Sequence, residues 1–433
     1  MTTDLLATTQ LPPAEGLDAP LGTLVSPDVG IVHRVDDGVC AWDHPRLAVA
    51  YAQLADTAPV LGAPTNARAG GLGASTEHAR RTAIGEAIER YSASWLPASR
   101  FRSARSAELA GQPTVPPDWL EPESPRPGSA AGPDPELDPD PVVRWVDGVR
   151  LRAGGPGAPA LVAVSRAFLT GTDDTHRVAV PTSTGLACHP DPWRALLSGL
   201  FEVIERDAVM TTWLTRAAVR PVRSPLRWRA ENGATVRFDH AVEDYRLYLL
   251  PSRTGIPVVL GAAYGAQGQP PVAVGAAADL DLAAAARKAL LETQQTFAWA
   301  ALMMARGDDV PDDPDAFHDL DDHVRYYLDP ARLPAFGFLR ESAPATACRT
   351  ELAVPRRPGQ PRAAVDEVLT RLAEAGLSAY AVDVTAPDVR AAGLWVIRAI
   401  VPQLMPLILG RRIPPRPGLD LSEARTRPPH PFP

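Results

Sequence analysis

The sequence predicts an α+β fold with mixed sheets, built as one large unit. Short runs that alternate apolar and polar residues indicate strands, and long helical patterns are interleaved with them. The chain has 433 residues, of which 45% are hydrophobic and 22% are charged, so it can bury a large core like an ordinary globular protein. No second composition regime marks an independent domain. A regular α/β domain is the alternative fold class.

Local patterns place the elements along the chain. The segment over residues 45–55 predicts a helix, and the rest of residues 30–61 predicts short strands. Further helices are predicted at residues 76–94, 190–214, 282–305 and 361–376. Alternating runs predict strands at residues 142–151, 160–169, 245–250, 257–265, 379–387 and 394–402.

Composition divides the chain into three parts. Residues 1–62 are expected to form an N-terminal segment that packs on the core, residues 63–410 the main domain and residues 411–433 a Pro-rich tail. Residues 120–142 are acidic and rich in proline, which is typical of a solvated loop.

Charge and cysteine content exclude several classes of partner and compartment. The net charge is −8 and no basic run occurs, which argues against nucleic acid and anionic membranes as partners. No apolar stretch of about 20 residues predicts a membrane span, and the N-terminus has no secretory signal pattern. The three cysteines Cys40, Cys188 and Cys348 are far apart, which favours reduced thiols and a cytoplasmic location.

The basic residues restrict how the chain can bind phosphate. Lys288 is the single lysine, and the other 42 basic residues are arginines. A P-loop needs a lysine in a Gly-rich motif, and the chain has no such motif. A bound phosphate would therefore be neutralised by arginines, backbone amides or metal ions.

Two helical patterns repeat the motif Glu-x-x-Glu-Arg. The motif occurs at residues 86–90 and 202–206, each after a Gly-Leu-small segment that indicates a turn. A third helical pattern places Glu292 and Gln295 at the same spacing. In all three, an alanine lies seven residues before the first glutamate: Ala79, Ala195 and Ala285.

The spacing places the two oxygen-bearing side chains of each pair on the same face of their helix. Residues three apart lie on one helix face, with Cβ atoms roughly 5–6 Å apart. The helix around Glu202 is apolar on most sides, so its carboxylates are expected to be buried and to need a counter-charge. Arg90 and Arg206 supply part of it, and oxygen-only ligands favour Mg²⁺ shared with phosphate. A solvated helix face is the alternative interpretation of any single copy.

Four segments together resemble the YcaO family, from about Pro64 to the last residue. They are GGLGASTEHARRTAIGEAIERYSA (70–93), PTSTGLACHPDPWRALLSGLFEVIERDAV (181–209), GAAADLDLAAAARKALLETQQ (275–295) and AVDVTAPDVRAAGLWVIRAIVP (381–402). The resemblance implies a YcaO-type fold with a non-P-loop ATP site, in which helix-borne glutamates hold Mg²⁺. The implied metal ligands are Glu86, Glu89, Glu202, Glu205 and Glu292, and the implied ATP-site residues are Arg206, Gln295, Arg398 and Glu205.

The C-terminus narrows the implied subtype. Pro429, Pro431 and Pro433 form a terminal Pro-x-Pro-x-Pro, which in this family is typical of azoline-forming cyclodehydratases. A Pro-rich tail is stiff and can reach back into the fold, and a linker is the alternative interpretation. In the implied reaction, a Cys, Ser or Thr side chain of a ribosomal precursor peptide attacks the preceding carbonyl. ATP phosphorylates the oxygen, and phosphate leaves to give a thiazoline or oxazoline.

Departures from the family pattern leave two other functions open. Leu72 stands where many members carry a lysine, and VPQLMP (401–406) lacks the usual glycine after Val-Pro. The alternatives are a YcaO enzyme that forms a thioamide or amidine, and a non-catalytic scaffold that binds a peptide or partner. The Cys188-His189 pair is interpreted as structural, since Pro190 follows it.

The resemblance also implies partners. Azoline-forming members generally act with a leader-peptide-binding protein related to E1-type enzymes. The YcaO-like part occupies most of this chain, so a separate E1-like partner and a precursor peptide are expected, together with a possible homodimer.

Overall fold

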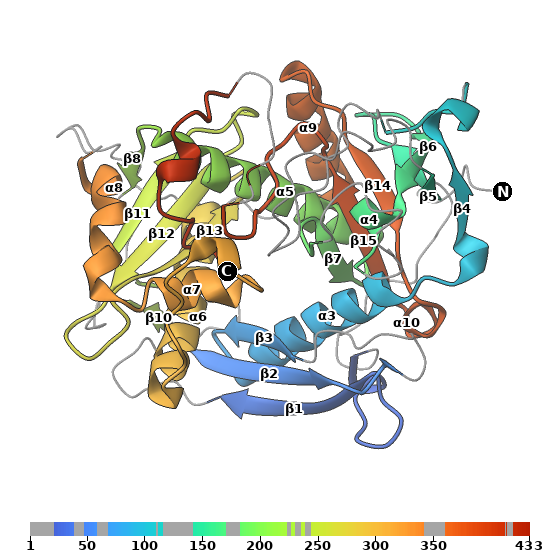
Figure 1. Cartoon of the computed structure of the whole chain (residues 1–433). Helices are drawn as coiled ribbons and strands as arrows, with labels where there is room; N and C mark the ends of the chain where they lie inside the picture. Colours follow the sequence, from blue (N-terminus) through green and yellow to red (C-terminus); the bar gives the residue numbers. More distant parts are fainter. Residues whose placement is uncertain are drawn as a thin grey trace.

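The computed structural model describes residues 21–38, 47–58, 68–109, 111–115, 142–169, 182–222, 227–229, 235–238, 244–341, 360–411, 413 and 419–433. The expected boundary between residues 62 and 63, most of the acidic loop at 120–142, Cys40 and Cys348 lie outside these residues. Within them, helices and several antiparallel sheets form an α+β fold, which confirms the predicted class (Figure 1).

Three sheets make up most of the β structure. Sheet A has the order β1-β2-β3, and sheet C has the order β13-β12-β11-β8. Sheet B has the order β4-β5-β14-β15-β7, with β6 also paired to β5, and β9 and β10 form a separate hairpin. All the strand pairs between named strands are antiparallel.

The strand bounds are as follows. Sheet A contains β1 (Val32–Gly38), β2 (Ala48–Leu54) and β3 (Arg68–Gly73). Sheet B contains β4 (Phe101–Ala104), β5 (Val143–Arg150), β6 (Ala158–Ala163), β7 (Leu186–His189), β14 (Tyr380–Asp383) and β15 (Trp395–Ile400). The remaining strands are β8 (Arg220–Val222), β9 (Arg227–Arg229), β10 (Thr235–Arg237), β11 (Asp244–Leu250), β12 (Val258–Tyr264) and β13 (Ala273–Ala278).

Four of the described helices exceed ten residues, and all four were predicted. They are α3 (Thr76–Ser94), α5 (Pro192–Thr215), α6 (Leu282–Arg306) and α9 (Pro361–Glu374). Shorter helices are α4 (Val164–Ala167), α7 (Asp321–Tyr326), α8 (Gly337–Glu341) and α10 (Pro387–Ala391).

Three long helices join the three sheets into a ring. Helix α3 packs on β2 and β3 of sheet A and also on β7 of sheet B. Helix α5 packs on β7 and β15 of sheet B and also on β13 of sheet C. Helix α6 packs on β12 and β13 of sheet C and also on β3 of sheet A. Figure 1 shows the result, with sheet C at the left, sheet B at the right and sheet A at the bottom.

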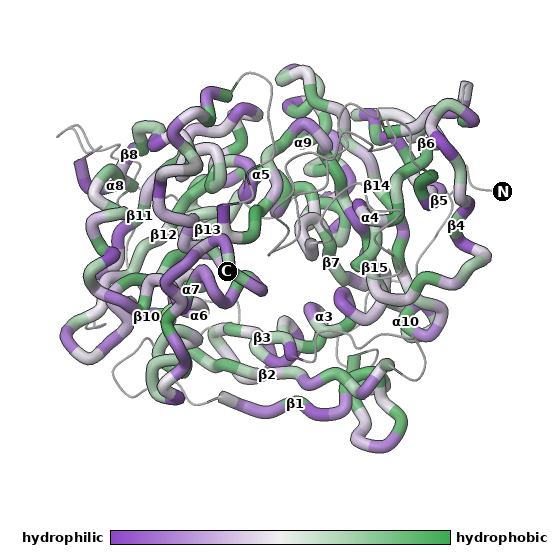
Figure 2. The backbone as a smooth tube through the Cα atoms, viewed as in Figure 1, coloured by the Kyte–Doolittle hydropathy of each residue, from purple (hydrophilic) through white to green (hydrophobic). Residues whose placement is uncertain are grey.

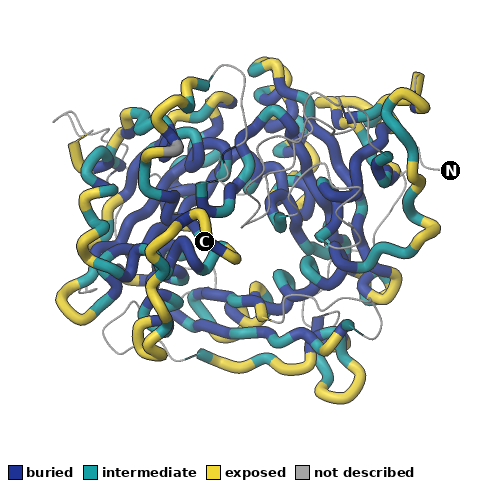
Figure 3. Tube along the Cα trace, viewed as in Figure 1, coloured by how far each residue is buried: buried dark blue, intermediate teal, exposed yellow. Residues whose placement is uncertain are grey.

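Each junction has its own hydrophobic core. One cluster joins sheets A and B under α3, a second joins sheets B and C around α5, and a third joins sheets C and A under α6. Figure 2 shows apolar residues along the inner strands, and Figure 3 shows the same segments buried. The charged outer strand β1 is largely exposed instead.

Three local predictions were wrong in whole or in part. The predicted strand at 379–387 ends at Asp383, and α10 begins at Pro387. Residues 48–54 form strand β2, and no helix covers residues 45–55 in the described part of that segment. Ala50, Ala52 and Leu54 face the core on alternate positions, so the strand period outweighs the helix propensity of the alanines. The predicted strand at 160–169 ends at Ala163, where the short helix α4 begins.

Glycine sets the distance between β3 and α3, which gives a stability prediction. A Cβ on Gly71 would lie 2.1 Å from the Ala79 carbonyl oxygen and 2.5 Å from the Ala83 amide nitrogen. Gly71→Ala should therefore lower the free energy of unfolding by at least about 1–3 kcal/mol, the usual effect of overpacking. Urea denaturation measures the change.

Gly85 is the matched control for this substitution. It lies in α3, and a Cβ there would meet no atom within 4 Å. Gly85→Ala should raise the free energy of unfolding by about 0.5–1 kcal/mol, because alanine is the better helix former. Equal stability of Gly71→Ala and the wild-type chain would contradict the close packing of this strand and helix.

Candidate functional site

Three strand–helix units carry the predicted carboxylates: β3–α3, β7–α5 and β13–α6. In each unit a capping side chain accepts hydrogen bonds from backbone amides at the helix start. Each cap lies eleven residues before the first glutamate of its pair, so each glutamate lies about 16 Å along its helix at 1.5 Å per residue. The caps are Ser75, Asp191 and Asp281, which precede Glu86, Glu202 and Glu292.

The strand before each helix contacts the same glutamate. The amide of Gly70 donates to Glu86 Oε2 at 3.2 Å, and the amide of Gly185 donates to Glu202 Oε2 at 2.8 Å. The segments at 71–73 and 185–187, predicted as turns, lie largely in strands β3 and β7. The Gly70 amide in β3 and the Gly185 amide just before β7 each partly satisfy the carboxylate that they contact.

The third unit repeats this contact without the hydrogen bond. A Cβ on Gly275 would lie 2.8 Å from the Cβ of Glu292, so the strand and helix are equally close there. Across the ring, a Cβ on Gly70 would lie 3.4 Å from Gln295 Nε2. Because Gly70 also binds Glu86, side chains from α3 and α6 meet at one backbone position.

Glu89 is the most enclosed carboxylate on α3. Burial raises the pKa of Glu89 well above its usual range, the amide of Cys188 lowers it, and repulsion from Glu86 and Glu202 raises it again. The amide of Cys188 donates to Glu89 Oε1 at 2.7 Å. Burial and Glu89 together raise the pKa of the Cys188 thiol, which keeps it protonated and fits a structural role.

Carboxylates of α5 and α6 also face one another. Glu205 is 3% exposed, and burial followed by repulsion from Glu292 raises its pKa well above the usual range. Burial also raises the pKa of Glu292, Lys288 lowers it and Glu202 raises it. Glu202 thus interacts with carboxylates on all three helices.

Lys288 supplies a positive charge to this group of carboxylates, and the sequence did not identify it as a site residue. Its Nζ lies 3.6 Å from Glu292 Oε1, one helical turn away. Desolvation opposes the charge of Lys288, but its side chain is 51% exposed, and attraction to Glu292, Glu205 and Glu202 raises its pKa. The sequence did contain a feature that could have identified this residue, because the single lysine lies four residues, about one helical turn, before Glu292.

Among the residues that the structure describes, some buried donors of Arg206 and Arg398 have no hydrogen-bond partner. Arg206 binds Glu202 Oε1 through Nη2 at 2.8 Å, while its Nε and Nη1 make no hydrogen bond. Arg398, on β15, donates from Nη1 to the carbonyl of Thr182 at 2.6 Å, while its Nε has no partner. Burial lowers the pKa of Arg398 to about 10, and Glu202 opposes this shift. Buried unpaired donors beside carboxylates suit an anion that arrives with a cation.

Predicted carboxylates of α3, α5 and α6 therefore interact electrostatically, and four of the five, all but Glu205, have a hydrogen bond or ion pair with protein groups in the described part of the chain. Glu86, Glu202 and Glu292 pair with Arg90, Arg206 and Lys288 on their own helices. Among the residues that the structure describes, no three Asp, Glu, His or Cys side chains are arranged as a metal-ligand set. Carboxylate oxygens and arginine donors are the groups with which Mg²⁺ and phosphate interact, so these side chains are candidates to hold them.

The end of the chain lies beside this cluster. Pro429 and Pro431 are buried, Pro433 is half-buried, and Phe432 is 4% exposed. The Phe432 ring centroid lies 5.7 Å from the Arg206 guanidinium carbon. The tail is therefore packed into the fold, and its last residues contact an arginine that binds Glu202.

Leu72 points into the core. It is 6% exposed and packs with apolar residues of sheet A, sheet C and α6. The positive charge that many family members carry at this position is therefore missing from β3, whereas Lys288 presents one from α6.

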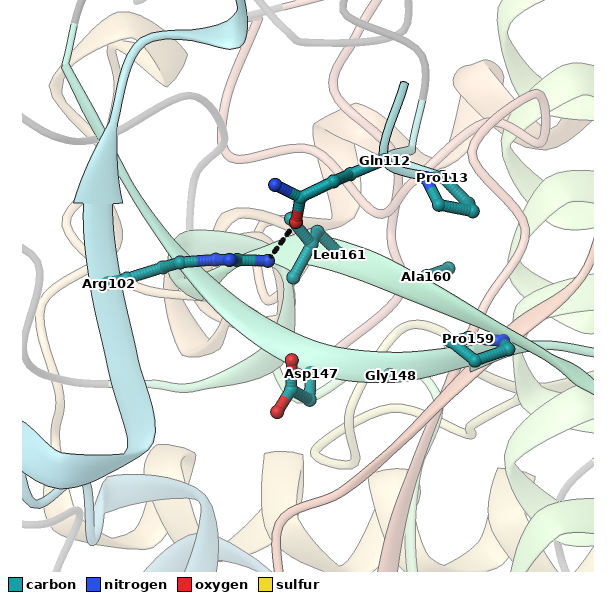
Figure 4. Close-up of a pocket in the computed structure, with 8 residues that line it drawn as sticks. All are labelled: Arg102, Gln112, Pro113, Asp147, Gly148, Pro159, Ala160 and Leu161. Carbon is teal, nitrogen blue, oxygen red and sulfur yellow. Dashed lines mark hydrogen bonds between the residues drawn. The ribbon is translucent and has the colours of Figure 1, made fainter. Parts of the chain in front are cut away.

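A cavity of about 120 Å³ lies elsewhere, on the β4–β5–β6 part of sheet B (Figure 4). No residue of α3, α5 or α6 lines it, so it is separate from the carboxylates. Figure 4 shows Arg102 and Gln112, which share a hydrogen bond of 2.5 Å, on one side and Asp147 on the other.

None of the described helices is long and apolar enough to span a bilayer.

Comparison with solved structures identifies the fold. A heterocyclase in complex with substrate and cofactor superposes with a TM-score of 0.65 at 19% identity, over 90% of this chain and 52% of that one. YcaO from Methanopyrus kandleri bound with AMPPCP and Mg²⁺ gives 0.60 at 21% identity, over 90% and 91%. The E. coli microcin synthetase McbBCD complex gives 0.59 at 14% identity, over 92% and 96%.

At these sequence identities, the superpositions establish similarity of fold alone. The chain spans about half the length of the first heterocyclase. No curated protein sequence matches the chain. A family model described as YcaO cyclodehydratase, ATP- and Mg²⁺-binding, matches residues 70–405, which is most of the chain. The chain therefore belongs to the YcaO family of ATP-dependent, Mg²⁺-binding cyclodehydratases, as the sequence resemblance implied.

Proposed function

We propose that the protein is an azoline-forming cyclodehydratase. It converts Cys, Ser or Thr in a ribosomal precursor peptide to a thiazoline or oxazoline at the expense of ATP. The observation that carries the proposal is the meeting of carboxylates from α3, α5 and α6 around Glu202, next to unpaired donors of Arg206 and Arg398. This arrangement combines the charges that a Mg²⁺–triphosphate requires.

The proposed roles are those that the family resemblance implies, and the positions of the side chains support them. Bound MgATP supplies a phosphoryl group that turns the amide oxygen of the peptide into a good leaving group. Five carboxylates hold the metal: Glu86, Glu89, Glu202, Glu205 and Glu292. Arg206, Gln295 and Arg398, with Glu205, bind or orient the nucleotide.

The protein contributes mainly position and charge. The unpaired Nε and Nη1 of Arg206 and the Nε of Arg398 are preorganised donors, so they stabilise negative charge without rearranging. Burial of Glu89 and Glu205 makes their charged forms costly in isolation, which favours a divalent cation between them. No nucleophile of the protein is required, because the peptide side chain attacks its own backbone carbonyl.

The partners are part of the proposal. Similar structures include a heterocyclase solved with substrate and cofactor and the McbBCD synthetase complex. A separate leader-peptide-binding, E1-like protein is proposed as the partner on the family resemblance, and one of the similar structures is itself a complex. A homodimer is proposed on the family resemblance alone.

Two readouts test the function with the full chain, its partner and a Cys/Ser/Thr-containing precursor peptide. ADP release that depends on the peptide is expected, together with a loss of one water per azoline by mass spectrometry. Exchange of oxygen for sulfur would indicate a thioamide-forming enzyme instead. Peptide binding without ADP release or a mass change would indicate a non-catalytic scaffold and overturn the proposal.

Replacement of Glu202 by Gln should abolish ATP turnover and leave the fold intact. Glu202 contacts both Arg206 and the amide of Gly185, in the turn before β7, and interacts with the other carboxylates. We expect ATP turnover to fall by at least about 100-fold, because removal of even an outer-shell partner of a metal ligand lowers metal affinity or activity by about 10–100-fold.

ADP release measures turnover of this variant, and circular dichroism checks its fold. The exposed Glu374→Gln, at the end of α9, is the charge-matched control and should behave like the wild type. Unchanged turnover of Glu202→Gln would remove that residue from the metal site.

Lys288→Met should destabilise the metal-free protein more than the Mg²⁺-loaded one. Without the ammonium, Glu292, Glu205 and Glu202 repel one another, and a divalent cation can replace its charge. In EDTA we expect the free energy of unfolding to fall by roughly 1 kcal/mol, the upper end of the range for exposed ion pairs. Addition of Mg²⁺ should make this loss smaller.

Thermal unfolding with EDTA and with Mg²⁺ measures this difference. Lys288→Arg keeps the positive charge and is the control, so its stability should respond to Mg²⁺ like that of the wild type. A loss for Lys288→Met that is equal in both conditions would show that Mg²⁺ does not bind beside Lys288.

Deletion of Pro431 to Pro433 should impair cyclisation more than folding. The deletion removes the Phe432 ring from Arg206, and burial of one large apolar side chain contributes about 1.5–3 kcal/mol to stability. Phe432→Ala, which keeps the prolines, separates loss of the ring from loss of the terminal motif. Full cyclisation by the truncated chain would show that the tail is only a linker.

A further inference from the structure

Two histidines form a buried stacked pair that none of the roles above uses. His323 lies on α7 and His430 lies in the C-terminal tail, and they are 0% and 1% exposed. Their ring centroids are 3.8 Å apart and their planes differ by 12°. Full burial of two stacked imidazoles requires that their nitrogens be satisfied by specific partners.

The hydrogen bonds of the pair fix both tautomers. His323 Nε2 accepts from the amide of Gly410 at 2.9 Å, so Nδ1 carries the proton and donates to the carbonyl of His430 at 2.6 Å. His430 Nδ1 accepts from the amide of Phe432 at 3.2 Å, so Nε2 donates to the carbonyl of Ile408 at 2.6 Å. Every ring nitrogen is engaged, and both rings must be neutral.

The pair thereby ties three segments together. It joins α7, the segment at 408–410 and the last residues of the tail. Two further bonds hold the tail upstream: Trp213 Nε1 donates to the carbonyl of Pro428 at 3.0 Å, and the Tyr327 hydroxyl donates to that of Pro429 at 2.5 Å. In the described part of the chain, the histidine pair binds the backbone on both sides of Pro431, at the His430 carbonyl and the Phe432 amide.

We propose that His323 and His430 are positioning residues that hold the end of the chain against Arg206, and that they do so only as neutral imidazoles. The link is a series of contacts, since His430 binds the amide of Phe432, the Phe432 ring lies over Arg206, and Arg206 binds Glu202. The catalytic consequence rests on the proposed function, whereas the docking of the tail does not.

The surrounding charges set the direction of the pH response. Burial lowers the pKa of His323 to about 4, while the His430 carbonyl and Asp322 raise it. Burial lowers the pKa of His430 well below its usual range, and repulsion from His323 and Arg206 adds to this. These pKa values lie below those of unfolded histidine, so docking is complete above about pH 6.5 and weakens as the pH falls toward 4.

Protonation would also break specific bonds. A proton on His323 Nε2 would face the amide of Gly410, and a proton on His430 Nδ1 would face the amide of Phe432. Two stacked cations beside Arg206 would then repel one another, with Asp322 the carboxylate that opposes this. Acid should therefore release the tail before the rest of the fold is lost.

Hydrogen exchange of the full chain tests the docking directly. In His323→Phe the ring can still stack, but both hydrogen bonds of His323 are lost. Exchange at the Gly410 and Phe432 amides should increase at least about 10-fold, which corresponds to about 1.4 kcal/mol of local stability. His33→Phe, at an exposed position of β1, is the control and should leave both amides protected. Unchanged exchange in His323→Phe would overturn the proposal.

Kinetics separate the positioning role from simple docking. With partner and peptide, His323→Phe should lower kcat for cyclisation by about 10-fold or more and change KM for ATP less than about 3-fold. His323→Asn can replace the Nδ1 donor with an amide and should recover part of the loss. Faster exchange with unchanged kcat would overturn the positioning role, and failure of the wild type to cyclise would overturn the proposed function instead.

Labelled-histidine NMR of the wild-type chain keeps the test independent of variants that fail to fold. At pH 7 the ¹⁵N shifts should show one buried histidine protonated at Nδ1 and one at Nε2. Titration toward pH 4 should convert both to imidazolium together with release of the tail amides. An imidazolium at pH 7, or tail release without histidine protonation, would overturn the proposal.

Discussion

The structure depends on one electrostatic constraint, the mutual repulsion of carboxylates that the fold brings together. Glu89, Glu202, Glu205 and Glu292 come from three helices, and burial with like-charge repulsion raises the pKa of Glu89, Glu205 and Glu292. Strand amides and basic side chains on the same helices only partly balance this charge. A divalent cation with its phosphates would relieve this repulsion, and the family to which the chain belongs binds ATP and Mg²⁺.

The ring of sheets explains how helices that are far apart in sequence reach one point. Each of α3, α5 and α6 packs on the sheet that contains its own preceding strand and on the next sheet around the ring. A cap at the same offset begins each helix, so Glu86, Glu202 and Glu292 lie equally deep. The C-terminal tail completes the arrangement, because the His323–His430 pair brings Phe432 to Arg206.

The sequence predicted the parts whose signals are local. The long helices and the three-residue spacing of their glutamates follow from periodicity, and family membership follows from the motifs. Local patterns failed where tertiary pairing decides, as at β2, whose alanines resemble a helix but pair between β1 and β3. Lys288 was missed because its partners Glu205 and Glu202 lie on another helix, and the His323–His430 contact joins residues 107 positions apart.

The claim that the three helices share one metal–nucleotide site is tested most directly by diffraction. Crystals grown with Mn²⁺ and a non-hydrolysable ATP analogue would locate the metal by its anomalous signal. The account predicts anomalous peaks bounded by carboxylates of α3, α5 and α6, with the phosphates against Arg206 and Arg398. A metal bound by carboxylates of a single helix, or outside the ring of sheets, would contradict it.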